Sequence, residues 1–71
     1  MGRNENMRKA RLLKGLSQEE LARQAGISRQ TVNMMERGDY NPSVSLALRI
    51  CWILECTLDD LFWREKEREE A

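Results

Sequence analysis

Residue types along one stretch of the chain mark the ends of two short helices. Ser17 and Glu20 have the spacing of a capping box, in which each residue accepts a hydrogen bond from the backbone amide of the other. Gly26 follows the apolar positions of this segment, and glycine readily adopts the left-handed backbone that ends a helix. Ser28 then caps a second helix, which ends at Gly38. The sequence therefore predicts two helices joined by a three- or four-residue turn centred on Gly26, which is the pattern of a helix-turn-helix.

Three further helices are predicted, and no segment has the alternation of a strand, so we expect an all-α fold. One covers about residues 4–14 and ends at Gly15. Another runs from Ser43 to about Leu54, after a loop over 39–42, and the last begins at a second cap-like box at 57–60. We expect residues 1–63 to form one helix-turn-helix domain and residues 64–71 to form a charged C-terminal tail.

Helical spacing and apolar character predict one small core. Ile27 is expected to fill the corner of the turn between the paired helices. The other expected core residues are Met7, Ala10 (or Arg11), Leu12, Leu13, Leu16, Leu21, Ala22, Ala25, Val32, Met35 (or Glu36), Leu46, Leu48, Ile50, Ile53 and Leu54.

Composition excludes several classes of function. The 71 residues include no histidine, which is the commonest metal ligand and general base. Cys51 and Cys56 lack the spacing of a Cys-x-x-Cys metal site, and we expect buried free thiols. We therefore expect no enzyme, no cofactor and no metal. Because no apolar run approaches the roughly 18 residues of a membrane helix and no signal peptide is visible, we expect a cytoplasmic protein that does not bind membranes.

The net charge of zero hides an asymmetry between the two halves of the chain. Residues 1–37 hold eight basic and four acidic residues, a net +4, whereas residues 38–71 hold four basic and eight acidic, a net −4. Phosphate attraction is screened within about 10 Å at ordinary salt, so a polyanion responds to the local charge. The N-terminal half is therefore the half expected to face a nucleic acid.

The second helix of the pair carries two polar stripes. Arg29, Asn33 and Arg37 recur every four residues on one stripe, and Gln30 and Met34 form the next. Both stripes avoid the core positions of the same helix. Arginine reads guanine, amide side chains read adenine, and an apolar group contacts the thymine methyl, so this face is suited to a major groove.

Residues 16–38 strongly resemble the Xre/Cro-like helix-turn-helix family, which includes the repressors of lambdoid phages. The resemblance extends over residues 7–62, through Asn41-Pro42 and the segment 58–62. The residues that fall at the family's spacing are Ala22, Gly26, Ser28, Val32, Glu36, Gly38 and Pro42. What the resemblance implies is a five-helix, lambda-repressor-like domain that binds double-stranded DNA. It implies a sequence-specific transcriptional regulator, most simply a repressor, acting as a homodimer on a near-palindromic operator.

The resemblance also implies roles for individual residues. Arg11 and Glu36 are expected to form an ion pair that ties the first helix to the recognition helix. The residues implied in base contacts are Arg29, Gln30, Asn33 and Met34, with Asn33 also suited to sugar or phosphate. Those implied in phosphate contacts are Gln18, Ser28, Thr31, Arg37, Tyr40 and Asn41.

Three positions depart from the family pattern. Met34 replaces a polar residue, so base preference cannot be transferred from relatives. Asp39 lies in a loop that often carries basic residues, which should weaken phosphate binding there. Glu55 stands where glycine or asparagine usually ends the fourth helix, which predicts either mild backbone strain or an uninterrupted turn.

An apolar patch near the end of the domain predicts a dimer surface formed by Trp52, Leu58, Leu61, Phe62 and Trp63. The alternative is that these residues complete a thin core. The same surface keeps open a different class of function, a protein-interaction module such as an antitoxin or coactivator with a protein partner.

Overall fold

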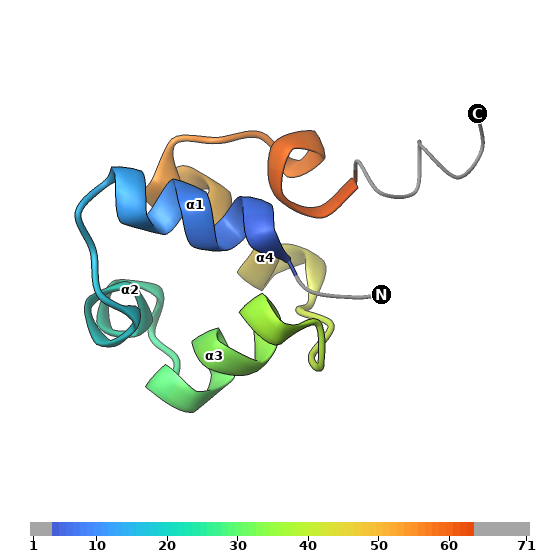
Figure 1. Ribbon diagram of the computed structural model, residues 1–71. Coiled ribbons are helices and arrows are strands. Elements are labelled where there is room, and N and C mark those ends of the chain that lie inside the picture. Colours follow the sequence, from blue (N-terminus) through green and yellow to red (C-terminus); the bar gives the residue numbers. More distant parts are fainter. Residues whose placement is uncertain (1–3, 64–71) are drawn as a thin grey trace.

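The computed structural model describes residues 4–63 as four α-helices followed by one turn of π-helix (Figure 1). The elements are α1 (Glu5–Leu13), α2 (Gln18–Ala25), α3 (Arg29–Arg37), α4 (Val44–Leu54) and η1 (Asp59–Trp63). No strand occurs in this range, which confirms the predicted all-α fold. The predicted tail at 64–71 lies outside the described residues, as do residues 1–3.

Side-chain caps begin the four α-helices. Asn4 Oδ1 accepts a hydrogen bond of 3.1 Å from the amide of Met7, and α3 and α4 begin in the same way at Ser28 and Ser43. At α2 the capping box is complete: Ser17 Oγ lies 3.0 Å from the Glu20 amide nitrogen, and Glu20 Oε1 lies 2.8 Å from that of Ser17. These bonds satisfy amides that have no partner inside a helix, so the predicted helix starts are confirmed.

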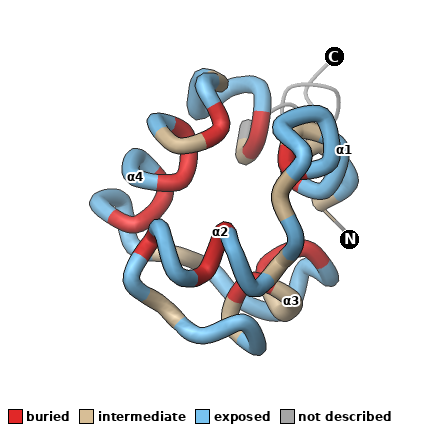
Figure 2. The backbone as a smooth tube through the Cα atoms, turned by 90° about the vertical axis from the view of Figure 1, so that its left-hand side faces the viewer, coloured by how far each residue is buried: buried red, intermediate tan, exposed pale blue. Residues whose placement is uncertain are grey.

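The core lies where the four α-helices and η1 meet, and the buried residues in Figure 2 face this interior. Its most deeply buried side chains are Met7, Leu21, Val32, Met35 and Ile50, so α1 to α4 all contribute. α2 packs against both α3 and α4, while α1 contacts α3 and η1. Among residues 4–63 no helix is long and apolar enough to cross a bilayer.

Three leucines predicted in the core are on the surface. Leu13 is 87% exposed and Leu12 and Leu48 are each about half exposed, which corrects the prediction for all three. The cause in α1 is the spacing of its buried residues, because Met7 and Arg11 lie four residues apart and occupy the inward stripe. The next two residues of that helix then point away from the core. Apolar character alone therefore gave a wrong prediction for Leu12 and Leu13, because Arg11 occupies the inward position at this end of α1.

The end of α4 is tied to the end of α1. Glu55 has a φ of 58°, in the left-handed region, and the Cys56 amide donates a 2.9 Å hydrogen bond to the Cys51 carbonyl. This is the helix ending usually made with glycine, so the predicted backbone strain is present at Glu55. The Glu55 carboxylate lies 2.9 Å from Lys14 Nζ at the end of α1. An exposed ion pair therefore accompanies the strained residue.

The second predicted cap-like box is present at the start of η1. The Asp60 amide donates to Thr57 Oγ1, and the Thr57 amide donates to Asp60 Oδ2, both at 3.1 Å. The turn that follows places Leu61 in the core with 3% exposure. This turn closes the core at the side where η1 contacts α1.

Candidate nucleic-acid interface

The turn between α2 and α3 sets the angle of the candidate reading helix. Gly26 adopts a φ of 75°, and the amide of Ile27 donates to the Ala22 carbonyl at 3.0 Å. Arg49 reaches across from α4 and donates through Nη1 to the Ala25 carbonyl at 2.9 Å. This guanidinium satisfies a carbonyl at the end of α2, where cations are favoured. This contact was not predicted from the sequence, because it joins residues far apart in the chain.

The outer face of α3 presents the predicted reading residues to solvent. Arg29, Gln30 and Arg37 are exposed, while Asn33 and Met34 are half-buried. The opposite side of the helix buries the residues Val32, Met35 and Glu36. The two stripes predicted from spacing therefore lie together on one accessible side of the helix.

Ser28 and Thr31 form a hydroxyl pair at the start of α3. Ser28 Oγ accepts a 3.1 Å hydrogen bond from the Thr31 amide, and the two hydroxyl oxygens lie 2.9 Å apart. Both residues were predicted to contact phosphate. Their hydroxyls lie at the N-terminal end of α3, where a helix stabilises an anion.

A second set of predicted phosphate contacts lies at the other end of α3. Arg37, Tyr40 and Asn41 are exposed around the turn that follows Gly38. Arg37 Nε lies 3.5 Å from the Asp39 carboxylate, and both side chains are more than half exposed. Such a pair is weak in water, so Asp39 reduces the charge that Arg37 offers a phosphate without fixing its position.

The buried ion pair implied by the family resemblance is present. Arg11 Nε donates to Glu36 Oε2 at 2.7 Å, and Nη2 donates to Glu36 Oε1 at 3.2 Å. The third guanidinium nitrogen, Nη1, donates to the Leu16 carbonyl at 2.9 Å. Both residues are buried, and the bidentate geometry holds α3 at a fixed orientation to α1.

Gln18 links this buried pair to the exposed face of α3. Its amide nitrogen lies 3.1 Å from Glu36 Oε1 and 3.3 Å from Asn33 Oδ1, and its amide oxygen lies 3.4 Å from Arg29 Nη1. From the sequence, Gln18 was expected only to contact a phosphate. No sequence signal points to this second role, because it depends on Asn33 and Glu36 of α3 meeting Gln18 of α2 in the folded chain.

The residues of the predicted dimer surface are partly in the core and partly exposed. Leu61 belongs to the core and Phe62 packs against it, so for these two residues the surface prediction is wrong and the alternative of a completed core holds. Trp52 is 82% exposed on α4, and Leu58 is also exposed. The side chain of Trp63 lies outside the described residues.

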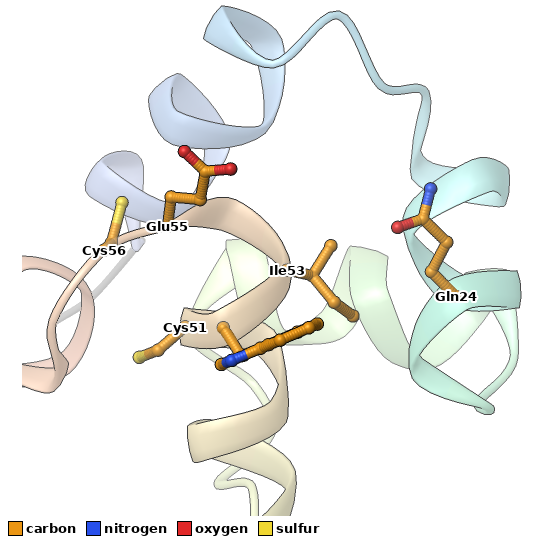
Figure 3. Close-up of a pocket in the computed structure, with 6 residues that line it drawn as sticks. Gln24, Cys51, Ile53, Glu55 and Cys56 are labelled. Carbon is orange, nitrogen blue, oxygen red and sulfur yellow. The ribbon is translucent and has the colours of Figure 1, made fainter.

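A shallow groove of about 500 Å³ lies between the end of α4 and Gln24 of α2 (Figure 3). Its other lining residues are Cys51, Trp52, Ile53, Glu55 and Cys56.

The two cysteine thiols beside this groove are both free. Cys51 is buried as predicted, and Cys56 is half-buried. Burial, and then mutual repulsion between the two thiolates, raises the pKa of Cys51; burial and nearby Asp60 raise the pKa of Cys56. The described residues contain no cluster of three or more side chains that could hold a metal ion.

Comparison with known proteins identifies the same architecture. A helix-turn-helix family profile matches residues 7–61. The chain is 49% identical over 53 residues to YgzD, an HTH-type transcriptional regulator of Bacillus subtilis, and the match covers 75% of this chain and 80% of YgzD.

Two solved structures agree with this match. The restriction-modification controller protein C.AhdI of Aeromonas hydrophila superposes with a TM-score of 0.76 at 37% identity, covering 83% of this chain and 89% of that protein. The hypothetical transcription factor NHTF from Neisseria gives 0.72 at 34% identity, covering 93% and 77%. The expectation that this chain is not an enzyme agrees with these regulators. The chain belongs to the Xre/Cro-like helix-turn-helix family of DNA-binding transcriptional regulators.

Proposed function

We propose that this chain is a sequence-specific repressor that binds a near-palindromic operator as a homodimer, with α3 of each protomer in the major groove. The observation that carries the proposal is the outer face of α3, where Arg29 and Gln30 are exposed above a helix anchored by the buried pair of Arg11 and Glu36. A helix that is already held in one orientation loses less conformational freedom on binding. The reading residues on it can therefore discriminate between DNA sequences. A cytoplasmic location, alongside the DNA, belongs to the same proposal.

Direct base reading falls to four residues. Arg29 donates two hydrogen bonds to a guanine, and Gln30 pairs through its amide with an adenine. Met34 supplies an apolar contact to a thymine methyl. Asn33 already accepts a hydrogen bond from Gln18, so its amide donors are the part that reaches a base edge or the neighbouring sugar. The operator therefore contains a guanine and an adenine in each half-site.

Phosphate contacts on both sides of α3 fix its position in the groove. At one end lie Gln18, which begins α2, and the Ser28 and Thr31 hydroxyls. At the other end lie Arg37, Tyr40 and Asn41. Contacts of this kind carry no sequence information but set the register of the helix on the duplex. Repression then follows from occupancy, because a bound dimer blocks polymerase at the operator.

Selection of bound sequences from a random duplex pool tests the proposal. The expected result is an inverted repeat whose half-sites are centred about one helical turn, roughly 34 Å, apart. Affinity should fall steeply as salt rises, because binding releases counterions from the phosphates. Recovery of no enriched sequence, together with binding that is equal for all duplexes, would contradict the proposal.

A protein-interaction module is the second candidate function, and the 82% exposure of Trp52 on α4 favours it. The two functions are compatible, because α4 and α3 present different surfaces. Stoichiometric binding of a protein partner, with no shift of any duplex at about 50 mM salt, would support this candidate over the repressor.

A further inference from the structure

Both donor hydrogens of the Gln18 side chain are engaged within the domain. Its Nε2 lies 3.1 Å from Glu36 Oε1 and 3.3 Å from Asn33 Oδ1, one amide hydrogen for each. Its Oε1 lies 3.4 Å from Arg29 Nη1 on the exposed side. The side chain therefore has no donor left for a phosphate.

The buried ion pair determines the orientation of the Gln18 amide. Arg11 holds the Glu36 carboxylate through bonds of 2.7 and 3.2 Å, and the oxygens of a carboxylate only accept hydrogen bonds. A reversed Gln18 amide would place its own oxygen against Glu36 Oε1, with two acceptors facing each other and no hydrogen between them. The half-buried Gln18 therefore turns its NH2 group toward the buried pair.

The same constraint passes from Gln18 to Asn33. Because Gln18 offers its NH2 group, Asn33 has to offer its oxygen, and a reversed Asn33 amide would set two donors against each other. The Nδ2 group of Asn33 is then directed away from Gln18. Within residues 4–63 this nitrogen makes no hydrogen bond, and no buried side-chain nitrogen lacks a partner, so Nδ2 is reached by solvent.

We propose that Gln18 is a positioning residue that makes Asn33 a reader of keto oxygens in the major groove. The buried pair orients Gln18, Gln18 orients the Asn33 amide, and Asn33 presents its two donor hydrogens to the base edge. Guanine O6 and thymine O4 accept such donors, whereas the amino groups of adenine and cytosine are donors themselves. A phosphate at the start of α2 is then bound by the backbone amide of Gln18. The inference rests on the proposed function, which places α3 in the major groove.

Arg29 does not depend on this arrangement. Its contact with Gln18 is long, at 3.4 Å, and its guanidinium offers only donors in any orientation. Loss of the Gln18 amide should therefore leave the guanine preference of Arg29 unchanged, while it frees the Asn33 amide to turn over. Two base pairs of one half-site thus respond differently to one substitution, which a general loss of folding or of phosphate binding does not produce.

Selection of bound sequences from a random duplex pool, followed by competition binding of operators that differ at one base pair, tests the inference. The position read by Asn33 is the one whose preference disappears in Asn33→Ala. There the wild type should favour guanine or thymine over adenine or cytosine by roughly 10-fold. Gln18→Met removes the amide and keeps the length of the side chain, so this ratio should fall close to one.

Two further substitutions test the direction of the effect. Gln18→Lys restores a donor toward Asn33 and Glu36, so the preference for a keto oxygen should return, while the added charge strengthens binding to all sequences alike. Asn33→Asp presents acceptors in place of donors, so the preference at that position should change to cytosine. Gln24→Met is the matched control, since Gln24 is an exposed glutamine of the same helix, and it should leave every preference unchanged.

Three results of the binding experiment would overturn the inference. Uniform weakening of all operators by Gln18→Met would make the Gln18 side chain a phosphate contact. An unchanged preference at the Asn33 position in Gln18→Met would show that Asn33 is oriented without Gln18. No position that responds to Asn33→Ala would show that Asn33 contacts no base.

A measurement on the free protein separates failure of this inference from failure of the repressor proposal. Exchange of side-chain amide hydrogens with water, followed by NMR, should be several-fold slower for Gln18 than for Gln24, and Asn33 should exchange at a rate comparable to Gln24. If this pattern is observed but no sequence is selected, the repressor proposal has failed. If a specific operator is selected but Gln18 exchanges as fast as Gln24, or Asn33 is the protected side chain, the positioning role of Gln18 has failed.

Discussion

Arg11 and Glu36 face each other inside the domain with 2.7 Å between Nε and Oε2, although 25 residues separate them in the chain. Their side chains are 8% and 4% exposed. Two charges this far from water are stabilised only by each other and by the groups around them, here the Leu16 carbonyl and the Gln18 amide. The described residues contain no buried side-chain nitrogen or oxygen without a partner. The pair therefore fixes the position of α3 more than it adds net stability.

Removing one member of this pair should be costly. Glu36→Gln leaves the Arg11 charge buried without its counter-ion, so the free energy of unfolding should fall by about 3 kcal/mol. Replacing both residues, as Arg11→Met with Glu36→Leu, should recover most of that loss because no unpaired charge remains. Urea unfolding followed by circular dichroism measures all three proteins. Lys14→Ala, which breaks the exposed pair with Glu55, is the control and should change stability by less than about 1 kcal/mol. A Glu36→Gln variant as stable as this control would contradict the assignment.

The strained end of α4 offers a stabilising substitution. A non-glycine residue in the left-handed region costs roughly 1–2 kcal/mol, and Glu55 has a φ of 58°. Glu55→Gly removes that cost and loses only an exposed ion pair, so we expect a net gain of about 0.5–1 kcal/mol and a higher Tm.

Glu55→Ala separates the two contributions. It loses the ion pair with Lys14 and keeps the unfavourable backbone, so it should be no more stable than the wild type. Thermal unfolding of the three proteins measures the order. If the alanine variant were stabilised as much as the glycine variant, backbone strain would not be the cause.

The features predictable from the sequence are the local ones. A serine three residues before a glutamate, or a glycine after an apolar stripe, fixes a helix end through bonds within one turn, and the structure shows those ends at Ser17 and Gly26. The exposed stripes of α3 follow from helical spacing in the same way. Residue type and helical spacing are enough to predict a feature when its stabilising contact lies within a few residues in the chain.

The features that were missed depend on contacts between distant segments. The contact of Arg49 with Ala25 and the bridge from Gln18 to Asn33 join different helices, and nothing local to either residue predicts them. The error at Leu13 has a related cause, because the inward position of α1 is taken by Arg11, whose partner lies on α3. A charged residue becomes a core residue only when the fold supplies its counter-ion.

The raised pKa of both thiols predicts slow alkylation. The thiolate is the nucleophile, so iodoacetamide at pH 8 should label the native protein far more slowly than the urea-unfolded chain. Cys51 is buried and Cys56 only half-buried, so Cys56 should react first. Peptide mass spectrometry resolves the two sites. Native labelling of Cys51 at the rate of the unfolded chain would contradict its burial.

The same thiols link stability to pH. Their folded-state pKa values lie above the ordinary value, so the unfolded chain releases its protons first as pH rises. The stabilisation is complete below the pKa of the unfolded chain and is lost as pH rises from there through the higher pKa of the folded state. The Cys51→Ala, Cys56→Ala double variant should show a smaller loss of stability between pH 8 and 10, measured by urea unfolding. An equal loss in both proteins would assign the pH dependence to other groups.

The reading role of Arg29 can be separated from a general electrostatic contribution. Arg29→Ala should cost roughly 1–3 kcal/mol of binding free energy at the selected operator and relax the preference at one base pair per half-site. Arg23→Ala is the matched control, since Arg23 is an exposed arginine of α2 that was assigned no DNA contact, and it should leave the base preference unchanged. Competition binding against single-base operator variants at fixed salt measures both effects, because a phosphate contact lowers affinity for all sequences alike. Uniform weakening across the variants by Arg29→Ala would make Arg29 a phosphate contact, and base reading would then fall to Gln30 and Met34.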